Sequence, residues 1–314
     1  MSIKKQQKRA NQSCLKGHAY SCARLGDLKF QSVRYGSQPE ASLSKYPSED
    51  CWRFQKSIRD YKKSCEMKNS YGCHKLGVVA TSCKKGKKAL IYYKMACNLK
   101  KKKSCYTLGN IYTKNKNHND AMYFFQQACN LKHSTSCNIL GENEFKKKKL
   151  IMAKSYFQKA CSNKHLESCL RLGQLEEKYF KNYKSARQFY VVICKRLTNK
   201  KNYNTLRPHL FAQLPILQLK GCFQLGHLEE KYLKNYKDAR KYYALTCERL
   251  ADNKKVSRRR MAPLSTRKEL AKACLNLAKL EKSKFNDSSK ISNYHQIACE
   301  NGHPSVCQKM PKRN

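Results

Sequence analysis

Cysteines recur in this chain at a spacing that few folds can accommodate. In six places two cysteines are separated by seven residues, and the first members of four consecutive pairs, Cys65, Cys97, Cys129 and Cys161, follow one another at an identical interval. A fixed period in the range of roughly 20–50 residues is the signature of an array of stacked repeat units, here helical hairpins. The six pairs are Cys14/Cys22, Cys65/Cys73, Cys97/Cys105, Cys129/Cys137, Cys161/Cys169 and Cys299/Cys307.

The sequence around each pair repeats as well. A Leu-Gly pair follows the second cysteine in most units, and an aromatic stretch with alanine precedes the first, as in MYFFQQAC, residues 122–129. In that stretch Phe124, Phe125, Ala128 and Cys129 fit the spacing of one helix face. We therefore predict an all-α fold, an α/α solenoid of about eight helical hairpins. Helix A carries the Leu-Gly, whose small residue lets helix B, which carries the aromatics, pack close.

The spacing also predicts disulfide bonds. Residues eight apart in one continuous helix are separated by about 12 Å, whereas bridged Cα atoms lie within about 7 Å. A turn between the two cysteines removes this conflict, so we expect each bridge to tie the end of helix B to the start of the next helix A. Two longer pairs, Cys194/Cys222 and Cys247/Cys274, keep the same flanking sequence despite their insertions.

Cys51 and Cys83 remain outside this scheme. Cys51 precedes Cys65 by the same interval as Cys83 precedes Cys97, so the two occupy equivalent positions in neighbouring units. Equivalent points on packed helices are about 10 Å apart, which is too far to bridge without bending. We expect two free thiols or a strained bond. Lys84 and Lys85 beside Cys83 make it the more reactive candidate.

We predict a basic N-terminal segment over 1–13 and a single solenoid over 14–314, with long insertions at 195–221 and 248–273. The first insertion contains the apolar stretch LFAQLPILQL, and the second contains KKVSRRR. Long loops on one face of a solenoid are often binding elements, and the alternative is a solvated remnant of duplication. No apolar run reaches the length of a membrane span, and the basic start lacks the apolar stretch of a secretory signal.

The formal net charge of +46, from 67 Lys and Arg against 21 Asp and Glu, has two interpretations. One is an anionic partner, such as nucleic acid, anionic lipid or an acidic protein. The other is a compositional bias spread over solvated helix faces, which the distribution of basic residues through every repeat favours. None of the basic runs is interleaved with aromatic residues in the manner of base stacking.

The Leu-Gly motif, the aromatic pair with alanine and the short period resemble the Sel-one-like repeat, a relative of the tetratricopeptide repeat. The resemblance covers Cys14 to Cys307. The paired cysteines are similar to the cysteine-rich subset of that family, which includes the Hcp-type bacterial secreted proteins and a mitochondrial intermembrane-space assembly factor for cytochrome c oxidase. The short units, the two insertions and the strong positive charge depart from that pattern.

The paired cysteines predict an oxidising compartment. We favour the mitochondrial intermembrane space, with an exported or periplasmic bacterial location as the alternative. The predicted function is a non-catalytic interaction or assembly scaffold for an acidic protein partner, with respiratory-complex assembly as the role that the resemblance implies. The alternatives are an Hcp-type β-lactamase or penicillin-binding protein, and nucleic-acid binding by charge alone.

Candidate chemistry is weak beside these features. A histidine four residues after the first cysteine, in His18, His133, His165 and His303, could serve a zinc site, but a polar turn residue explains the position better, so we predict no metal. The pairs Ser13/Lys16, Ser82/Lys85 and Ser265/Lys268 match Ser-x-x-Lys without the companion motifs of a serine β-lactamase. We predict no catalytic residue and no cofactor.

Repeat solenoids usually bind other chains on the surface that their helices A form. This surface is concave, and residues of helices A near the Leu-Gly should line it. We therefore predict, as residues that contact a partner, Arg24, Lys75, Arg171 and Gln224 on helices A, and Arg258, Arg259 and Arg260 in the second insertion.

Overall fold

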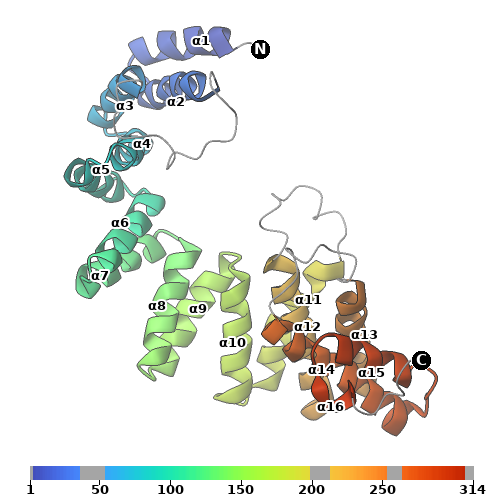
Figure 1. Ribbon diagram of the computed structural model, residues 1–314. Coiled ribbons are helices and arrows are strands. Elements are labelled where there is room, and N and C mark those ends of the chain that lie inside the picture. Colours follow the sequence, from blue (N-terminus) through green and yellow to red (C-terminus); the bar gives the residue numbers. More distant parts are fainter. Residues whose placement is uncertain (1–2, 36–53, 199–212, 253–263, 308–314) are drawn as a thin grey trace. The chain divides into compact units, whose positions relative to one another are not determined.

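The computed structural model describes residues 3–35, 54–198, 213–252 and 264–307. In these ranges every regular element is a helix and no strand occurs (Figure 1), which confirms the all-α solenoid fold. No helix in the described part of the chain is long and apolar enough to cross a bilayer. The α-helices are α1 (Ile3–Leu15), α2 (Ala19–Tyr35), α3 (Gln55–Glu66), α4 (Ser70–Ser82), α5 (Gly86–Asn98), α6 (Lys102–Lys114), α7 (His118–Asn130), α8 (Ser134–Lys146), α9 (Leu150–Ser162), α10 (Leu166–Lys178), α11 (Tyr183–Thr198), α12 (Gln213–Lys231), α13 (Tyr236–Asp252), α14 (Leu264–Leu280), α15 (Ile291–Glu300) and α16 (Pro304–Cys307), and a π-helical turn, η6 (Glu281–Phe285), follows α14.

The chain divides into two compact units, Met1–Asn163 and Lys164–Asn314. Even-numbered helices are helices A, most of which carry the Leu-Gly motif, and odd-numbered helices are helices B. Residues 3–13, predicted as a basic N-terminal segment, belong to α1, and Gln7 on this helix donates a hydrogen bond to the carbonyl of Leu28 on α2 at 3.3 Å. A single solenoid over 14–314 stays a prediction.

Helices α4 to α10 are all of the same length, and all the turns between them are equally short. Each helix has 13 residues, and a turn of three residues separates it from the next. One period of the cysteines therefore contains two copies of a single helix–turn element. Because the two helices of a hairpin have equal length, their ends meet at both edges of the array.

The three-residue turns share one backbone geometry. After α3, Lys68 lies in the left-handed region at φ 56° and donates its N–H to the carbonyl of Cys65 at 2.9 Å, while Asn69 donates to Ser64 at 3.1 Å. This pair of bonds is a Schellman cap. The side chain of Asn69 then accepts two backbone N–H bonds at the start of α4, as an N-cap does. One short turn thus ends one helix and begins the next.

Lysine occupies the left-handed position in most of these turns. Gly17 and Gly302 hold it at the first and last cysteine turns. A left-handed residue other than glycine costs roughly 1–2 kcal/mol, and a cation at a helix C-terminus recovers roughly 0.3–1 kcal/mol. Lysine is therefore less favourable than glycine here. The lysines with positive φ are Lys68, Lys84, Lys100, Lys116, Lys132, Lys148, Lys164, Lys181 and Lys234.

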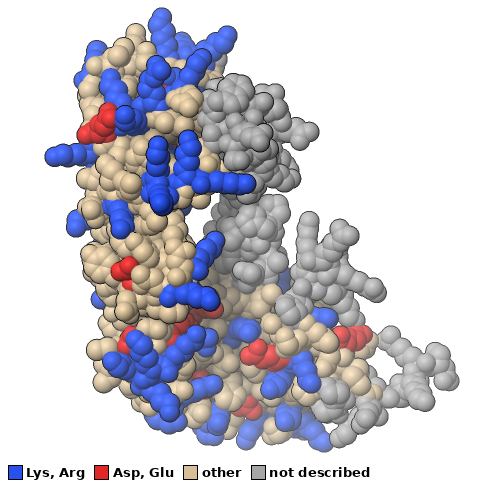
Figure 2. Space-filling model, turned by 60° about the vertical axis from the view of Figure 1, so that its left-hand side comes forward, with Lys and Arg blue, Asp and Glu red and all other residues tan. Residues whose placement is uncertain are grey.

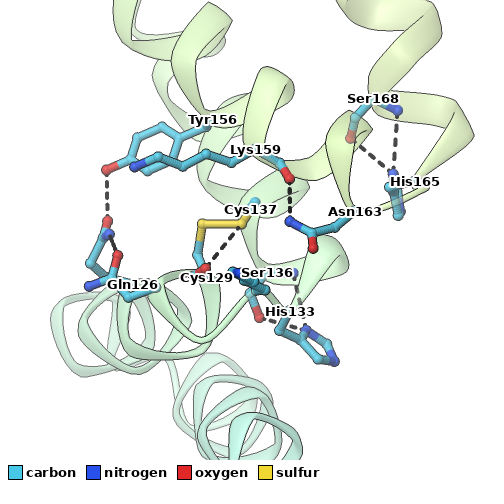
Figure 3. The surroundings of a disulfide bond; sticks show 12 residues. Gln126, Cys129, His133, Ser136, Cys137, Tyr156, Lys159, Asn163, His165 and Ser168 are labelled. Carbon is cyan, nitrogen blue, oxygen red and sulfur yellow. Dashed lines mark hydrogen bonds between the residues drawn. A yellow bond between two sulfur atoms is a disulfide. The ribbon is translucent and has the colours of Figure 1, made fainter.

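Disulfide bonds join the end of a helix B to the start of the following helix A, as predicted. Figure 3 shows one of them, Cys129–Cys137, at the turn between α7 and α8. The Cα atoms of the bridged pairs lie 4.6–5.0 Å apart, inside the range for unstrained bridges. The other bonds are Cys14–Cys22, Cys65–Cys73, Cys97–Cys105, Cys194–Cys222, Cys247–Cys274 and Cys299–Cys307.

Cys161 and Cys169 are disulfide-bonded as well. Cys83 is also disulfide-bonded and is buried. Of the two alternatives for this position, the bonded one therefore holds, and Cys83 is not a free, reactive thiol. Cys83 follows the last residue of α4 and caps that helix. Cys51 lies outside the described residues.

The glycine of each Leu-Gly pair lies against an aromatic ring of the following helix B, so the predicted close packing is confirmed. A Cβ atom on Gly109 would lie 2.5 Å from the ring of Phe125, and one on Gly77 would lie 2.6 Å from the ring of Tyr93. Both rings are buried. The same contact occurs at Gly26–Tyr61, Gly141–Phe157, Gly173–Tyr190 and Gly226–Tyr243.

The insertions begin and end as helix. In the first, α11 continues past Cys194, and α12 begins well before Cys222. Leu219, from the predicted docking stretch, is 2% exposed and Ile193 is fully buried. This part of the stretch therefore extends the core of the hairpin, and residues 199–212 lie outside the described residues. In the second insertion α13 and α14 are extended in the same way, and residues 253–263, with KKVSRRR, also lie outside.

Replacement of Gly109 by alanine should destabilise the protein by about 1–3 kcal/mol, because the new methyl group overpacks the buried ring of Phe125. Gly86 begins α5, and a Cβ atom there would meet nothing within 4 Å. Gly86→Ala is therefore the control and should be neutral or stabilising. Urea unfolding of both oxidised variants measures the difference, and equal effects would show that the glycine contact is not tight.

Candidate binding groove on the helix-A face of the second unit

Three helices A of the second unit, α10, α12 and α14, line one elongated groove. Its largest part is a cavity of 820 Å³, and two smaller hollows have 400 and 170 Å³. His227 and Asn276 line both the largest and the second hollow. Gln224 and Glu269 line both the largest and the third. Because they share these lining residues, the three hollows are neighbours along the same helices.

Each of the three helices contributes one stripe of side chains. Residues three or four positions apart lie on the same face of a helix, and the lining residues follow that spacing. His295 on α15, His303 in the following turn and Val306 on α16 close one end of the largest cavity. The main stripes are Glu167, Arg171, Gln174 and Lys178 on α10, Lys220, Gln224, His227 and Lys231 on α12, and Glu269, Lys272, Asn276 and Lys279 on α14.

Most of the carboxylates in the groove have partners within the protein. Glu177 accepts a hydrogen bond from the hydroxyl of Tyr190 at 2.8 Å and pairs with His227 at 3.6 Å. Burial alone would raise the pKa of Glu177, but the contacts with His227 and Tyr190, with Lys178 nearby, outweigh it and lower the pKa. The hydroxyl of Tyr243 donates to Glu230 at 2.7 Å, which satisfies a second carboxylate.

Basic side chains outnumber these acids. Of the lysines, Lys220 forms an ion pair with Glu269 at 3.1 Å, whereas Lys272 and Lys279 on α14 are exposed. Burial, with Lys268 and Lys272 nearby, lowers the pKa of His303, so this side chain adds no full charge at neutral pH. The groove residues include the eight cations Arg171, Lys178, Lys220, Lys231, Lys234, Lys272, Lys279 and Lys284 and the four acids Glu167, Glu177, Glu230 and Glu269.

Two of the predicted partner-contacting residues line this groove. Arg171 lines the third hollow, and Gln224 lines the first and third. Asn276 occupies the equivalent position in α14, two residues after Cys274, and lines the groove too. Their role in binding stays a prediction. Arg258, Arg259 and Arg260 lie outside the described residues.

The helix-A face of the first unit contains an internal polar cluster. Asp27 accepts hydrogen bonds from the hydroxyls of Tyr61 at 2.8 Å and Tyr71 at 2.7 Å, and it pairs with the Nζ of Lys75 at 2.9 Å. Burial lowers the pKa of Lys75, but the contacts with Asp27 and Tyr71 outweigh it and raise the pKa. The predicted residue Lys75 is thus engaged within the fold, whereas Arg24 is exposed on α2.

The histidines after the first cysteines cap helices. His133 and His165 accept the backbone N–H of Ser136 and Ser168 at the starts of α8 and α10, and Figure 3 shows both contacts. The polar-turn interpretation of this position is therefore correct for these two residues. In the described residues no group of three or more His, Cys, Asp or Glu side chains is arranged to hold a metal.

The Ser-x-x-Lys matches form no catalytic arrangement in the described residues. The hydroxyl of Ser13 lies 2.8 Å from that of Ser21, and the hydroxyl of Ser82 donates to the carbonyl of Val78. Ser82 and Lys85 lie on opposite sides of the turn that ends α4. Ser265 is exposed in the first turn of α14.

Sequence reasoning missed most of the groove. Lys272, Lys279 and His227 were not singled out, because each is an unremarkable polar residue within its own repeat. One signal in the sequence could have found them. Each groove residue on a helix A lies three or four residues from another, in a series that includes the position two residues after the second cysteine. The side chains that line the groove come from successive helices A. In the sequence, a helix B and an insertion lie between one of these helices and the next, so only the packed structure brings the side chains together.

No protein-family model and no curated protein sequence matches the chain. Solved structures with similar folds include PilF of Pseudomonas aeruginosa, at 14% identity over 76% of this chain and 95% of that protein, with a TM-score of 0.41. A Sel1 repeat protein from Oxalobacter formigenes matches at 13% identity over 81% and 99%, with a TM-score of 0.38. The quorum sensor NprR of Bacillus thuringiensis matches at 13% identity over 95% and 87%, with a TM-score of 0.38. At this level of identity no function follows from the likeness.

The unfolding free energy should fall as the pH drops from about 6.5 to about 4, by up to about 3 kcal/mol from His74 alone. His74 is 5% exposed and lies 2.8 Å from the hydroxyl of Ser104. Burial, with Lys103, Lys101 and Lys75 nearby, lowers its pKa to about 4. The unfolded chain therefore binds a proton in this range that the folded protein does not. Urea unfolding at several pH values should show a smaller slope for His74→Gln and an unchanged slope for the exposed control His118→Gln.

Proposed function

We propose that this protein is a non-catalytic interaction scaffold, and that its second unit holds an acidic, extended segment of a partner protein in the groove of α10, α12 and α14. The observation that carries this proposal is the excess of cations in the groove, eight against four acids. Three of those acids already have partners within the protein, because Glu177 and Glu230 accept hydrogen bonds from Tyr190 and Tyr243 and Glu269 pairs with Lys220. A charged partner gains most where the opposite charge has no internal counterion.

The shape of the groove favours an extended occupant. The hollows run across three successive helices A, which suits a chain segment that contacts one helix after another, as repeat solenoids do. Apolar contact is available from Phe223 and Leu275, which line the largest cavity beside Lys272. Such a combination of apolar wall and cationic rim suits an acidic peptide with scattered apolar side chains.

The many disulfide bonds support an oxidising compartment for this activity. We favour the mitochondrial intermembrane space, with a role in the assembly of respiratory complexes, over export from a bacterium. None of the serines of the Ser-x-x-Lys matches lines this groove. A nucleic-acid backbone would engage the cations alone, whereas the apolar contacts from Phe223 and Leu275 favour a protein segment.

A fluorescent peptide of alternating glutamate and leucine residues is a direct probe of the groove. Lys272→Glu with Lys279→Glu should weaken its binding to the oxidised protein by about tenfold or more, because two uncompensated cations become anions. The matched control, Lys237→Glu with Lys241→Glu, makes the same change of net charge on α13, where both lysines are exposed and line no part of the groove. If both variants lost the same affinity for the peptide, the net charge alone would explain the binding, and the proposed groove would be refuted.

A further inference from the structure

Three turns of the first unit carry a concentration of exposed lysines. These turns join α4 to α5, α6 to α7 and α8 to α9, and because consecutive helices are antiparallel, all three lie on one edge of the stacked hairpins. Figure 2 shows basic side chains gathered over the first unit with few acidic ones among them. We name this surface the lysine edge, and it consists of Lys84, Lys85, Lys87, Lys88, Lys114, Lys116, Lys146, Lys147, Lys148 and Lys149, all of which are exposed.

The lysine edge has little internal compensation. In the segments 83–88, 114–120 and 144–149 the acidic residues are Asp120 and Glu144. Glu144 pairs with Lys147 at 3.2 Å, and Asp120 accepts a hydrogen bond from the amide of Asn117 at 2.8 Å. Most of the positive charge on this edge therefore faces solvent without a partner anion in the same turns.

Composition does not account for the regular placement of lysine in the turns. Lys and Arg are 67 of the 314 residues, which is about one residue in five, yet lysine holds the left-handed position in nine turns, and three of these, Lys84, Lys116 and Lys148, belong to the lysine edge. Glycine and asparagine are the residues that this conformation favours, and the chain uses glycine there at Gly17 and Gly302. A random basic bias would not select lysine repeatedly at the least favourable backbone position.

Large apolar side chains lie in solvent beside the lysine edge. Ile151 is 78% exposed and Met152 is 54% exposed, and they are the second and third residues of α9, which follows the lysine run. Ile91 and Tyr123 occupy the sixth position of α5 and α7, one turn further along the helix, and they are 57% and 58% exposed. Cations and apolar groups at the same edge are the combination that binds membrane interfaces.

We propose that the lysine edge docks on the surface of a membrane that contains anionic lipid. Lipid headgroups attract the lysines, and Ile151, Met152 and Ile91 enter the boundary between headgroups and acyl chains. The edge contains lysine and no arginine, and the compact ammonium charge suits a fluid array of headgroups that offers no fixed bidentate partner. The phosphates of a nucleic-acid backbone would attract the lysines, but they offer no apolar surface for the exposed isoleucine and methionine side chains.

The test uses the full-length oxidised protein and vesicles of phosphatidylcholine with or without phosphatidylserine. Lys146→Gln, Lys148→Gln and Lys149→Gln together should weaken cosedimentation with the anionic vesicles on the order of tenfold or more. The control variant, Lys100→Gln, Lys102→Gln and Lys103→Gln, removes the same charge from the opposite edge, and each variant removes one left-handed lysine. Its binding should change by less than about threefold. Equal loss in both variants would overturn the proposal.

A second variant separates a membrane from a nucleic acid. Ile151→Ser with Met152→Ser keeps every charge and changes two exposed side chains, so circular dichroism should show an unchanged fold. This variant should bind anionic vesicles several-fold more weakly and a duplex RNA oligonucleotide as well as the parent protein. If the parent protein fails to bind the anionic vesicles, or if the variant binds them unchanged, the membrane assignment is wrong. The result from the groove peptide does not affect this outcome, because the two surfaces belong to different units.

Discussion

The fold depends on the three-residue turn, where a Schellman cap, an N-cap and, at alternate turns, a disulfide bond coincide. The carbonyl of a first cysteine accepts the N–H of the left-handed residue three positions on, as Lys132 donates to Cys129 at 2.9 Å. The sulfur of the same cysteine is bonded to Cys137 on the next helix. In the chain-entropy model a bridge across so short a loop contributes about 2.5 kcal/mol. At a net charge of +46, repulsion between like charges destabilises the compact state. The disulfide bonds offset this repulsion, which packing would otherwise have to offset alone.

The same turn connects fold and surface. Helices of constant length place every turn between them at one of two edges, so a residue type repeated in the turns becomes a row on the surface. The glycine–aromatic contact keeps the two helices of a hairpin close, as at Gly141 and Phe157. The rows of polar side chains on helices A lie outside this contact. One sequence element thus builds both the stacking and the basic edge of the first unit.

Cysteine spacing and the Leu-Gly motif were sufficient to predict the architecture and the pairing across the turns, because both follow from backbone reach. The state of Cys83 could not be decided from the sequence, since equivalence between units says nothing about the path of the chain at a helix end. The shorter period of the single helix–turn element was visible in the printed sequence, in the lysines from Lys68 to Lys164, but lysine is usually interpreted as a solvated charge and not as a left-handed turn residue. The helical extension of the insertions was hidden, because an apolar stretch such as that around Leu219 fits a core and a docking loop equally well.

The groove was predictable only in part. The place of Arg171 and Gln224 near the Leu-Gly identified them, but the hydrogen bond from Tyr190 to Glu177 requires the packed arrangement of α10 and α11. Whether a charge is available to a partner depends on such contacts, and Lys75 shows the opposite case, because it is paired with Asp27. A count of charged residues along the sequence therefore includes some cations that are already paired within the fold and misses others that are available to a partner.

The central claim is that the hairpins are covalently joined at their turns. Peptide mapping by mass spectrometry, after alkylation of the native protein without reductant, tests it most directly. The account predicts that no described cysteine carries the alkylating group, and that digestion yields linked peptides for pairs such as Cys129–Cys137 and Cys194–Cys222. Alkylated cysteines throughout a protein that is still folded would contradict it.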